Sequence, residues 1–377
     1  MEKVRFDDFI KLNRGFDLPD ACIEDGPYPV VASTNIKAYH KDYKVDGPAV
    51  TTGRSGSLGK VQYIEGRCWP LNTSLYVKDF KGNNPRYAYY LLQTMHLEQY
   101  NAGAGVPTLN QNHLHSLKLL VHKKNEQARI AAILSAYDKL IENNNKRIQI
   151  LEKMAENLYK EWFVRFHFPG HENMSMENGL PKGWKYIIAG ERYNITIGKT
   201  PPRKEFEWFA SNDAYAQNWL TISDMKGMFV WDTAEQITRT AVARFNMFVL
   251  PVNTILLSFK LTVGRLAIAS MPLCTNEAIA HFVNVPTIEH EYLYQQLKVF
   301  DYRKLGNTSA IGNAINSKIV KSMKLVLPTS DNLKAFHEIL APVFNNIQSL
   351  TKQNSNLARQ RDLLLPRLMS GKLEVKP

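Results

Sequence analysis

The sequence predicts an α+β protein in which two pseudo-repeated globular α/β domains are separated by two long helices forming an antiparallel coiled coil. Three observations predict this fold class. The chain has 377 residues, which is enough for two or three domains. It aligns with itself at a shift of about 206 residues, a period that indicates a duplicated domain rather than a solenoid. Each half ends in a long segment whose apolar residues recur about every 3.5 residues, as in a coiled coil.

The two halves share a pattern more than they share identical residues. In each half, short β-type runs and many turn residues precede the long helical segment. Residues 50–54 align with 255–259, 59–61 with 264–266, Asn72 with Asn276, and 117–119 with 323–325. A stretch rich in Pro, Gly, Asn and Ser separates the halves and is typical of a linker. The sequence therefore predicts a first globular domain over 1–123, a first long helix over 124–167, a linker over 168–180, a second globular domain over 181–329 and a second long helix over 330–377.

The two long helices are predicted from apolar seams whose steps alternate between four and three residues. We expect the helices to be each other's partner, and ordinary core helices are the alternative. Asn144 and Asn354 interrupt the seams, where they either fix the register of the pair or lie at a solvated edge. A paired stalk spans roughly 48 Å at about 1.5 Å per residue and would suit a ligand with two separated sites. The seam residues are Ile130, Leu134, Ile141, Ile148, Leu151 and Leu158 in the first helix, and Phe336, Leu340, Ile347, Leu350, Leu357 and Leu364 in the second.

Charge and composition favour a polyanionic partner and exclude several protein classes. Lys and Arg number 47 against 35 Asp and Glu, a net charge of +12, which favours nucleic acid first and an anionic membrane surface second. The three cysteines are far apart and form no C-x-x-C motif, so we expect no disulfide framework or zinc ribbon, and a cytoplasmic location. Because the N-terminus is charged and the sequence has no long apolar run, we expect neither a signal peptide nor a membrane span.

Two turn-rich segments are candidates for contacts with phosphate. In the first half, residues 53–60 form a loop with three glycines, Arg54 and Lys60 between two β-type runs. Glycines let backbone amides approach a phosphate closely, and the cations supply charge. The alternative is a hairpin turn with a solvated Arg and Lys, because the segment lacks the spacing of a Walker A loop. In the second half, residues 258–265 occupy the matching place, and the basic segment 197–204 precedes them.

The second half also contains aromatic residues that have no match in the first. Trp208, Phe209, Tyr215 and Trp219 either pack on DNA or form a small core of their own. Side chains for catalysis are not predicted, because the sequence has no adenine-methyltransferase tetrapeptide, no dinucleotide-binding glycine motif, no zinc-ligand cluster and no nucleophile elbow. A lone histidine such as His281 is expected to be a satisfied core or surface residue. The chain is therefore predicted to bind rather than to catalyse.

Several segments together resemble the specificity (S) subunit of type I restriction–modification enzymes, along essentially the whole chain. Residues 179–184 resemble the opening of a recognition half, and 197–201 resemble the strand and turn that follow. Residues 126–134 resemble the start of that family's first conserved helix, and 364–373 the distal end of its second. The first half departs from the pattern because it lacks the Leu-Pro-x-Gly-Trp lead-in, and the second because 259–262 replace the glycine loop.

The resemblance implies a non-catalytic subunit that reads a bipartite asymmetric DNA site, one half with each target-recognition domain. Basic residues would grip phosphates and polar side chains would read base edges. The partners implied are double-stranded DNA, two modification subunits and restriction subunits. This chain would bind no cofactor itself, whereas the partner subunits would use S-adenosylmethionine, ATP and magnesium to methylate adenine or cleave DNA. The alternative is a coiled-coil scaffold that joins two protein-binding domains without contacting DNA.

Eleven polar residues are the DNA contacts that we predict from the turn-rich segments and the repeat. They are Arg54, Ser55, Ser57, Lys60 and Asn72 in the first half, and Lys199, Lys204, Lys260, Thr262, Arg265 and Asn276 in the second.

Overall fold

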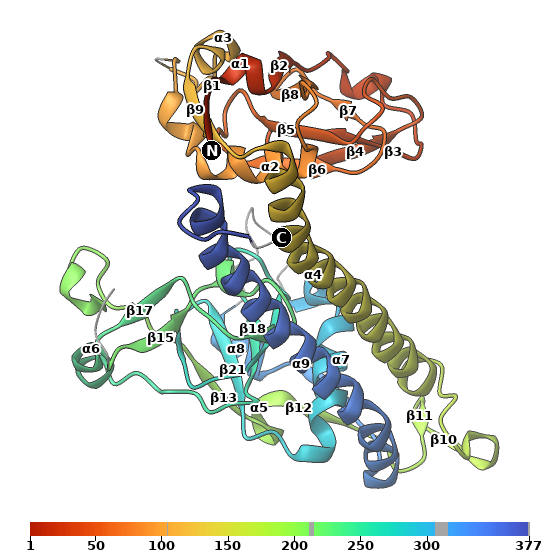
Figure 1. Cartoon of the computed structure of the whole chain (residues 1–377). Coiled ribbons are helices and arrows are strands. Elements are labelled where there is room, and N and C mark those ends of the chain that lie inside the picture. The colour runs from red at the N-terminus through yellow and green to blue at the C-terminus, as the bar shows by residue number, and fades with distance from the viewer. Residues whose placement is uncertain (104, 211–214, 306–315, 376–377) are drawn as a thin grey trace. The chain divides into compact units, whose positions relative to one another are not determined.

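A computed structural model describes residues 1–375 except 104, 211–214 and 306–315. The chain divides into two compact units, Met1–Ile141 with Asn356–Pro377 and Glu142–Ser355, and the boundary falls within both long helices (Figure 1). Each unit therefore contains one globular domain together with a part of each long helix. The two units are described separately below.

The first unit is built on three small sheets. The central sheet has the strand order β2-β8-β5-β6, and the chain ends of the domain meet where β1 pairs antiparallel with β9. The core between the central sheet and α2 contains Phe9, Leu75 and Tyr87, each at most 2% exposed. The strands are β1 (Glu2–Arg5), β2 (Lys11–Arg14), β3 (Tyr28–Val31), β4 (Ile36–His40), β5 (Ala49–Gly53), β6 (Val61–Ile64), β7 (Trp69–Pro70), β8 (Ser74–Asp79) and β9 (Lys118–Val121), and the helices are α1 (Phe6–Phe9), α2 (Pro85–Thr94) and α3 (Gln111–His115).

The second unit has a larger central sheet, with the order β13-β21-β18-β19-β16, beside a four-stranded sheet, β14-β17-β15-β20. Its strands β18 and β21 are buried along their whole length, as expected for strands covered on both faces. The strands are β10 (Met176–Glu177), β11 (Leu180–Pro181), β12 (Lys185–Ile188), β13 (Asn194–Ile197), β14 (Phe209–Ala210), β15 (Gln217–Leu220), β16 (Phe229–Val230), β17 (Glu235–Ile237), β18 (Ile255–Ser258), β19 (Leu266–Ala269), β20 (Cys274–Thr275), β21 (Ile279–Val283) and β22 (Lys324–Leu327), and the helices are α5 (Ala189–Arg192), α6 (Arg239–Arg244), α7 (His290–Val299) and α8 (Ser317–Lys321).

The predicted duplication is present in the strand order. The sequence β2-β8-β5-β6 in the first unit matches β13-β21-β18-β19 in the second, with the same antiparallel pairings. The parallel pair β3–β7 likewise matches β15–β20, and the closing pair β1–β9 matches β12–β22. The two domains are therefore copies of one topology, which low sequence identity had left to pattern alone.

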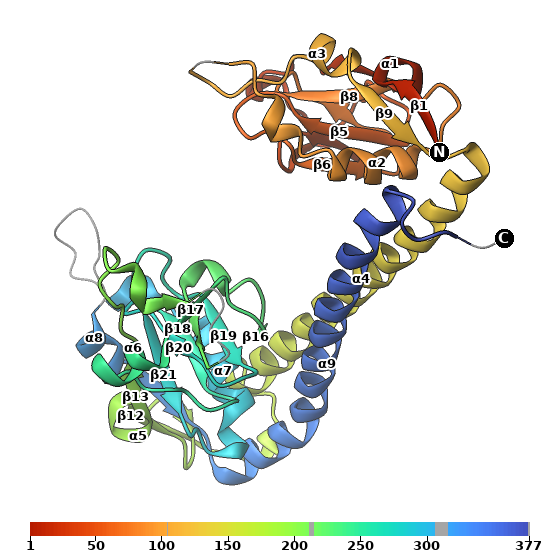
Figure 2. The same cartoon turned by 60° about the vertical axis from the view of Figure 1, so that its left-hand side comes forward.

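The long helices are α4 (Lys124–Tyr159), which continues in a π-helical turn over Lys160–Val164, and α9 (Ser330–Met369) (Figures 1 and 2). Within the first unit, Ile130 and Leu134 of α4 share a core with Leu364 and Leu368 of α9. Within the second unit, Leu151 and Leu158 share a core with residues 336–347. The beginning of each helix thus packs with the end of the other, so the predicted antiparallel pairing is confirmed, and the twelve predicted seam residues are buried or half-buried.

The segment predicted as a linker, 168–180, is packed into the second unit. Phe168 is 1% exposed, and its ring lies 5.3 Å from that of Trp184. The strands β10 and β11 then form a short hairpin around a left-handed Asn178 and Gly179. The turn-rich composition agrees with the hairpin turn found here. The segment is nevertheless not a free linker, because the aromatic side chain of Phe168 packs in the core.

Asn144 and Asn354 face each other across the helix pair. The Asn144 amide nitrogen donates to the Asn354 side-chain oxygen over 3.0 Å, and Asn354 donates to the side chain of Asn145 over 2.8 Å. Asn144 is only 6% exposed. Of the two alternatives, the structure therefore supports a buried polar pair in the seam, because a solvated edge would leave both amides in water.

Replacing only Asn354 with leucine is expected to lower the free energy of unfolding of the second unit by about 1–3 kcal/mol, because the buried Asn144 amide loses a partner. The double replacement Asn144→Leu with Asn354→Leu is expected to recover that loss, since an apolar pair leaves no unpaired amide. Urea unfolding of the three proteins measures both effects. A double variant that is no more stable than Asn354→Leu would contradict the pairing.

Candidate nucleic-acid interface

The glycine-rich loop of the first unit is the connection of the β5–β6 hairpin. Its amides are largely used inside the protein: those of Arg54 and Ser55 donate to the carbonyl of Thr73 over 2.8 and 3.1 Å, and that of Gly56 donates to Pro107 over 3.0 Å. The Ser33 hydroxyl, from the β3–β4 turn, also donates to Thr73 over 2.8 Å. The loop is therefore a braced hairpin turn, the alternative raised from the sequence, and not a nest of amides open to phosphate.

Two glycines of this loop are explained by the backbone of the turn and need no ligand to account for them. A side chain at Gly53 would lie 2.0 Å from the carbonyl oxygen of Ser57. Gly59 has a φ of +83°, and a side chain there would lie 2.5 Å from the carboxylate of Glu98. The backbone contact forbids a β-carbon at Gly53, and the left-handed φ favours glycine at position 59, so both glycines shape the turn that carries the polar side chains.

The five residues predicted in the first half divide into two groups. Ser57 and Lys60 are exposed on the hairpin loop and available to a ligand. Arg54 and Asn72 are half-buried and hold the turn: the Arg54 guanidinium donates to the carbonyl of Asn72 over 3.3 Å, and the Asn72 amide donates to the carboxylate of Asp17. Ser55 bridges to Thr108 through the backbone. The structure therefore brings these residues to one edge of the domain, but it engages some of them internally.

The matching edge of the second unit also contains residues with internal partners. The Lys199 ammonium donates to the carbonyls of Phe245 and Asn246 over 3.0 and 2.9 Å, just beyond the C-terminus of α6. The Asn276 side chain accepts from the amide of Ala278 over 3.2 Å, and the Arg265 guanidinium donates to the carbonyl of Ile222 over 2.9 Å. Cations and amides at helix and turn ends commonly satisfy such carbonyls and amides.

Lys204, Lys260 and Thr262 are exposed, and so are Lys199 and Arg265 despite their internal partners, whereas Asn276 is half-buried. Lys260 lies near Glu277: burial would raise the pKa of Glu277, but a hydrogen bond from Thr200 and the charges of Lys260 and Arg203 leave it below its usual value. Thr200 and Lys260 thus both lie near Glu277, which places segments 197–204 and 258–265 close to each other.

Sequence reasoning missed three cations in the second unit. Lys226 and Lys298 join Arg265 in lining a groove of about 510 Å³. The Arg203 guanidinium lies over the rings of both Phe209 and Trp219, 4.7 and 4.6 Å from their centres, and pairs with Glu235 at 2.8 Å. Lys226 and Lys298 follow no local motif and lie 39 and 33 residues from Arg265 in the sequence, so no spacing could have predicted the groove.

Most of the four aromatic residues that have no match in the first half belong to a small hydrophobic core. Trp219 is fully buried with Ile237 and Met247, and Trp208 and Phe209 pack against this cluster. Tyr215 is 76% exposed, so it alone of the four predicted aromatics lies at the surface. Packing rather than stacking on DNA accounts for the other three.

His281 is a buried histidine with two hydroxyl partners. Its ring nitrogens lie 2.9 Å from the Thr196 hydroxyl and 2.6 Å from the Thr275 hydroxyl, and the residue is 1% exposed. Burial lowers its pKa to about 3, because the charged ring would be removed from water. The expectation of a satisfied core histidine is confirmed.

Acid is expected to destabilise the second unit through His281. Its pKa is lower in the folded than in the unfolded chain, so the unfolded chain binds the extra proton as the pH falls below about 6.5. The free energy of unfolding should then decrease by about 1.4 kcal/mol per pH unit from this residue until the folded pKa is reached. Chemical unfolding of His281→Gln between pH 7 and 5 should show a shallower loss than the parent, and parallel curves would contradict this assignment.

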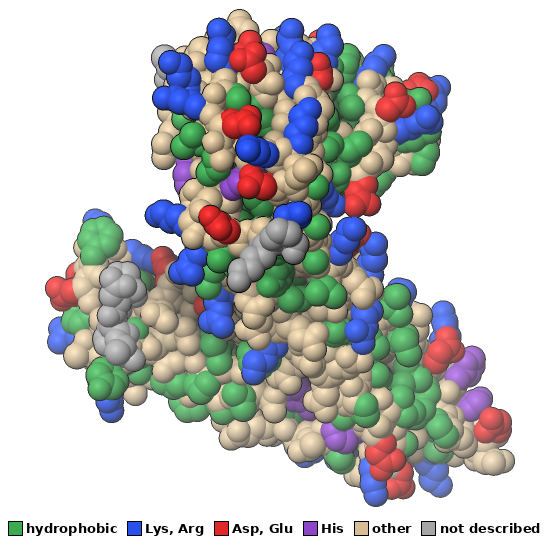
Figure 3. Space-filling model, viewed as in Figure 1, with side chains coloured by type: hydrophobic (Ala, Val, Ile, Leu, Met, Phe, Trp, Pro, Cys, Tyr) green, Lys and Arg blue, Asp and Glu red, His purple; other side chains and the backbone are tan. Residues whose placement is uncertain are grey.

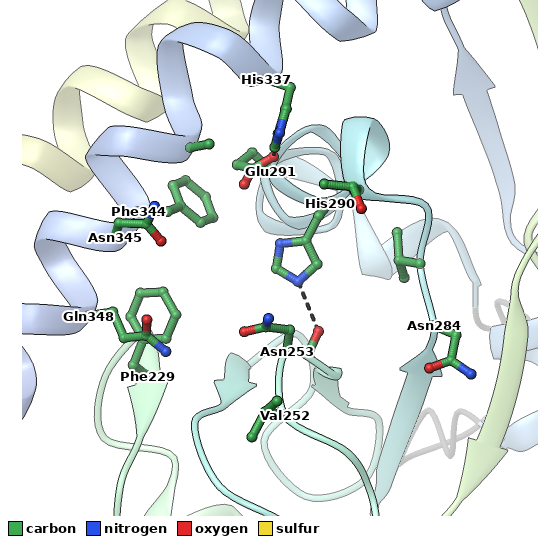
Figure 4. Close-up of a pocket in the computed structure, with 13 residues that line it drawn as sticks. Phe229, Val252, Asn253, Asn284, His290, Glu291, His337, Phe344, Asn345 and Gln348 are labelled. Carbon is green, nitrogen blue, oxygen red and sulfur yellow. Dashed lines mark hydrogen bonds and ion pairs between the residues drawn. The ribbon is translucent and has the colours of Figure 1, made fainter.

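A cavity of about 440 Å³ lies between α7 and the beginning of α9 (Figure 4). The His290 Nε2–H donates to the carbonyl of Asn253 over 2.9 Å, and His337 of α9 pairs with Glu291 of α7 at 2.6 Å. Burial lowers the pKa of His290. The His337–Glu291 pair joins α9 to the globular domain, whereas the His290–Asn253 hydrogen bond lies within that domain.

Charges are mixed on the face of the molecule shown in Figure 3, where cationic and acidic side chains alternate without a continuous basic patch. Within the described ranges, no group of three or more His, Cys, Asp or Glu side chains could hold a metal ion. Among the described helices, none combines the length and apolarity that a membrane crossing requires.

Comparison with known proteins identifies the family. The sequence matches the type I restriction modification DNA specificity domain twice, over residues 1–153 and 181–359. The chain belongs to this family. It is a specificity subunit, the DNA-recognition part of a restriction–modification complex, and the catalytic activities of such complexes belong to other subunits.

Individual relatives agree with the family assignment. The chain is 24% identical to the MjaVIII specificity subunit of Methanocaldococcus jannaschii, covering 100% of this chain and 93% of the relative. It is 26% identical to the MjaIX specificity subunit of the same organism, over 77% of this chain and 69% of the relative. The crystal structure of the type I S subunit from M. genitalium has the same fold, with a TM-score of 0.62, 17% identity and coverage of 98% of this chain and 96% of that one.

Proposed function

We propose that this specificity subunit recognises a bipartite, asymmetric DNA site, one half with each globular domain. The observation that carries the proposal is the duplication: two copies of one topology each present a hairpin loop, β5–β6 or β18–β19, with different side chains. Copies with different loops fit two unlike half-sites, because base edges are distinguished by the side chains that reach them. A scaffold without DNA contact is not favoured, since both halves match a DNA specificity domain.

The same proposal includes the partners. Two modification subunits would use S-adenosylmethionine to methylate adenine at the bound site, and restriction subunits would use ATP and magnesium to cleave DNA. This chain would bind none of these cofactors and would act in the cytoplasm. The family membership and the long helices, which present exposed apolar residues such as Ile150 and Met154, support an assembly with other subunits.

Co-expression with the neighbouring adenine-methyltransferase subunit tests the function. Genome-wide mapping of N6-methyladenine should reveal a split motif that appears only when this chain is present. Exchange of residues 181–329 for those of another family member should change one half of the motif and leave the other intact. An assembled complex that methylates no motif would contradict the proposal.

Lys60 is expected to contact a phosphate, because it is exposed on the hairpin loop without a carboxylate partner among the ion pairs of the described residues. For Lys60→Ala in the assembled complex, the slope of log K against log salt should decrease by about 0.9, with equal loss for cognate and unrelated DNA. Lys60→Arg retains the charge and is the matched control. An unchanged slope for Lys60→Ala would remove this residue from the interface.

A further inference from the structure

The loop between β18 and β19 displays a leucine at its tip (strands labelled in Figure 2). Leu261 is 95% exposed, more than any other large hydrophobic residue among those described, and its backbone has a φ of 58°. Both features are unfavourable for leucine. Exposing its apolar side chain to water costs free energy, and its β-carbon crowds the backbone in the left-handed region.

The repeat explains why the backbone is left-handed there. Gly56 occupies the equivalent position in the first unit, since 50–54 align with 255–259, and its φ is +80°. Three residues further on, Gly59 and Gly264 also correspond, with φ values of +83° and +85°. The turn geometry is thus common to both hairpins, and glycine satisfies it in one of them. Leucine is not needed to make the turn.

The loop is braced, so its tip is presented in a defined position. The hydroxyl of Ser258, which is fully buried, donates to the carbonyl of Thr262 and accepts from the amide of Arg265 over 3.0 Å. The side chain of Phe259 is 2% exposed and anchors the beginning of the loop. At its end, a β-carbon on Gly264 would meet the ring of Tyr302 at 2.9 Å. Preorganisation of this kind lowers the entropic cost of binding.

The neighbours of Leu261 indicate the kind of ligand. Lys260 and Thr262 flank it and are exposed, and Arg265 follows at the base of the loop. An apolar tip between cations matches DNA, where the cations meet phosphates and the apolar group meets a thymine methyl or an opened base step. A protein surface would match the leucine but would give less reason for the flanking charges.

We propose that Leu261 makes an apolar contact with the bases of the half-site read by the second domain and contributes to its sequence specificity. This inference rests on the proposed function. Gly56 makes no such contact in the first half-site, so the two hairpins differ in how they read DNA.

The test uses the complex with modification subunits and a duplex that carries the methylated motif. Leu261→Asn removes the apolar group and retains a residue that tolerates the left-handed backbone. It should weaken cognate binding by about tenfold or more, leave unrelated DNA and the salt slope unchanged, and leave the thermal midpoint unchanged or raised. Leu120→Asn, at another exposed leucine in the first unit, is the matched control and should not alter binding. Lys260→Ala should instead reduce the salt slope by about 0.9.

Two modified duplexes distinguish the sources of the apolar contact. Replacing thymine with uracil across the second half-site should weaken the parent complex at one position and have no further effect on Leu261→Asn, if a methyl group is contacted. A 2-aminopurine probe should brighten with the parent and not with the variant, if a base step is opened. Either result supports the contact.

Four outcomes overturn the inference. Unchanged cognate affinity for Leu261→Asn, or equal loss on unrelated DNA, would exclude a base contact. Weakened assembly with the modification subunits would assign Leu261 to a protein interface. A parent complex without sequence-specific binding would refute the proposed function as well, whereas the other three outcomes leave that function intact.

Discussion

Replacing Phe336 with alanine is expected to lower the free energy of unfolding of the second unit by about 3–5 kcal/mol. The Phe336 side chain is fully buried near the start of α9, and its ring centre lies 4.8 Å from that of Phe163 and 5.7 Å from that of Trp162. Tyr159 at the end of α4 lies 6.4 Å away. Truncation would leave a cavity among rigid rings that cannot collapse into it, so both the lost burial and the cavity add to the cost.

Urea unfolding followed by tryptophan fluorescence measures this effect, because Trp162 and Trp184 both belong to the same cluster. Ile339→Ala is the matched control on the same helix, since Ile339 is 48% exposed and its truncation should cost well under about 1 kcal/mol. A similar cost for both variants would mean that the start of α9 is not packed as described.

Replacing Arg361 with leucine is expected to cost the first unit about 2 kcal/mol. The Arg361 guanidinium donates to the carboxylate of Asp138 over 2.7 Å, and the Tyr90 hydroxyl donates to the other oxygen of the same carboxylate. Both charged side chains are largely shielded, with 26% and 19% of their surface exposed. Removal of the cation leaves a carboxylate with little water to replace it, and this partial exposure keeps the cost below that of a fully buried pair.

A double-mutant cycle with Asp138→Asn separates the pair from its surroundings. The double variant should cost less than the sum of the two single variants, because each single change leaves one group without its partner. Arg359→Leu, at an exposed position one half-turn away, should change stability by less than about 0.5 kcal/mol and serves as the control. Additive costs in the cycle would show that Arg361 and Asp138 act independently.

The helix pair could be predicted from the sequence because periodicity is a local property. Seam residues recur in both halves at steps that alternate between four and three, and a helix places residues three and four apart on one face whatever surrounds it. Arg361 lies four residues after Leu357 and three before Leu364, so it falls on the seam, where the apolar pattern predicts a hydrophobic residue. Its partner, Asp138, is 223 residues away in the sequence, and only the folded chain could identify it.

The candidate interface was less predictable for a related reason. Arg54, Asn72, Lys199 and Asn276 carry polar groups that suit DNA, and the same groups equally suit the carbonyls and amides of turns and helix ends. Lys199 binds carbonyls 46 and 47 residues away, beside a helix that the sequence pattern did not reveal. The exposure of Leu261 was also outside the reach of composition, since an apolar residue in a turn-rich segment is usually buried.

By itself, the sequence determined the duplicated architecture, the pairing of the long helices and the family. These features depend on the order, spacing and periodicity of residues, which are properties of the linear sequence. The tertiary structure decided which polar side chains remain available to a ligand, where Asn144 finds Asn354, and that the supposed linker belongs to a core. Those outcomes depend on groups that are distant in sequence, and a buried donor or acceptor must find a partner wherever the fold brings one near.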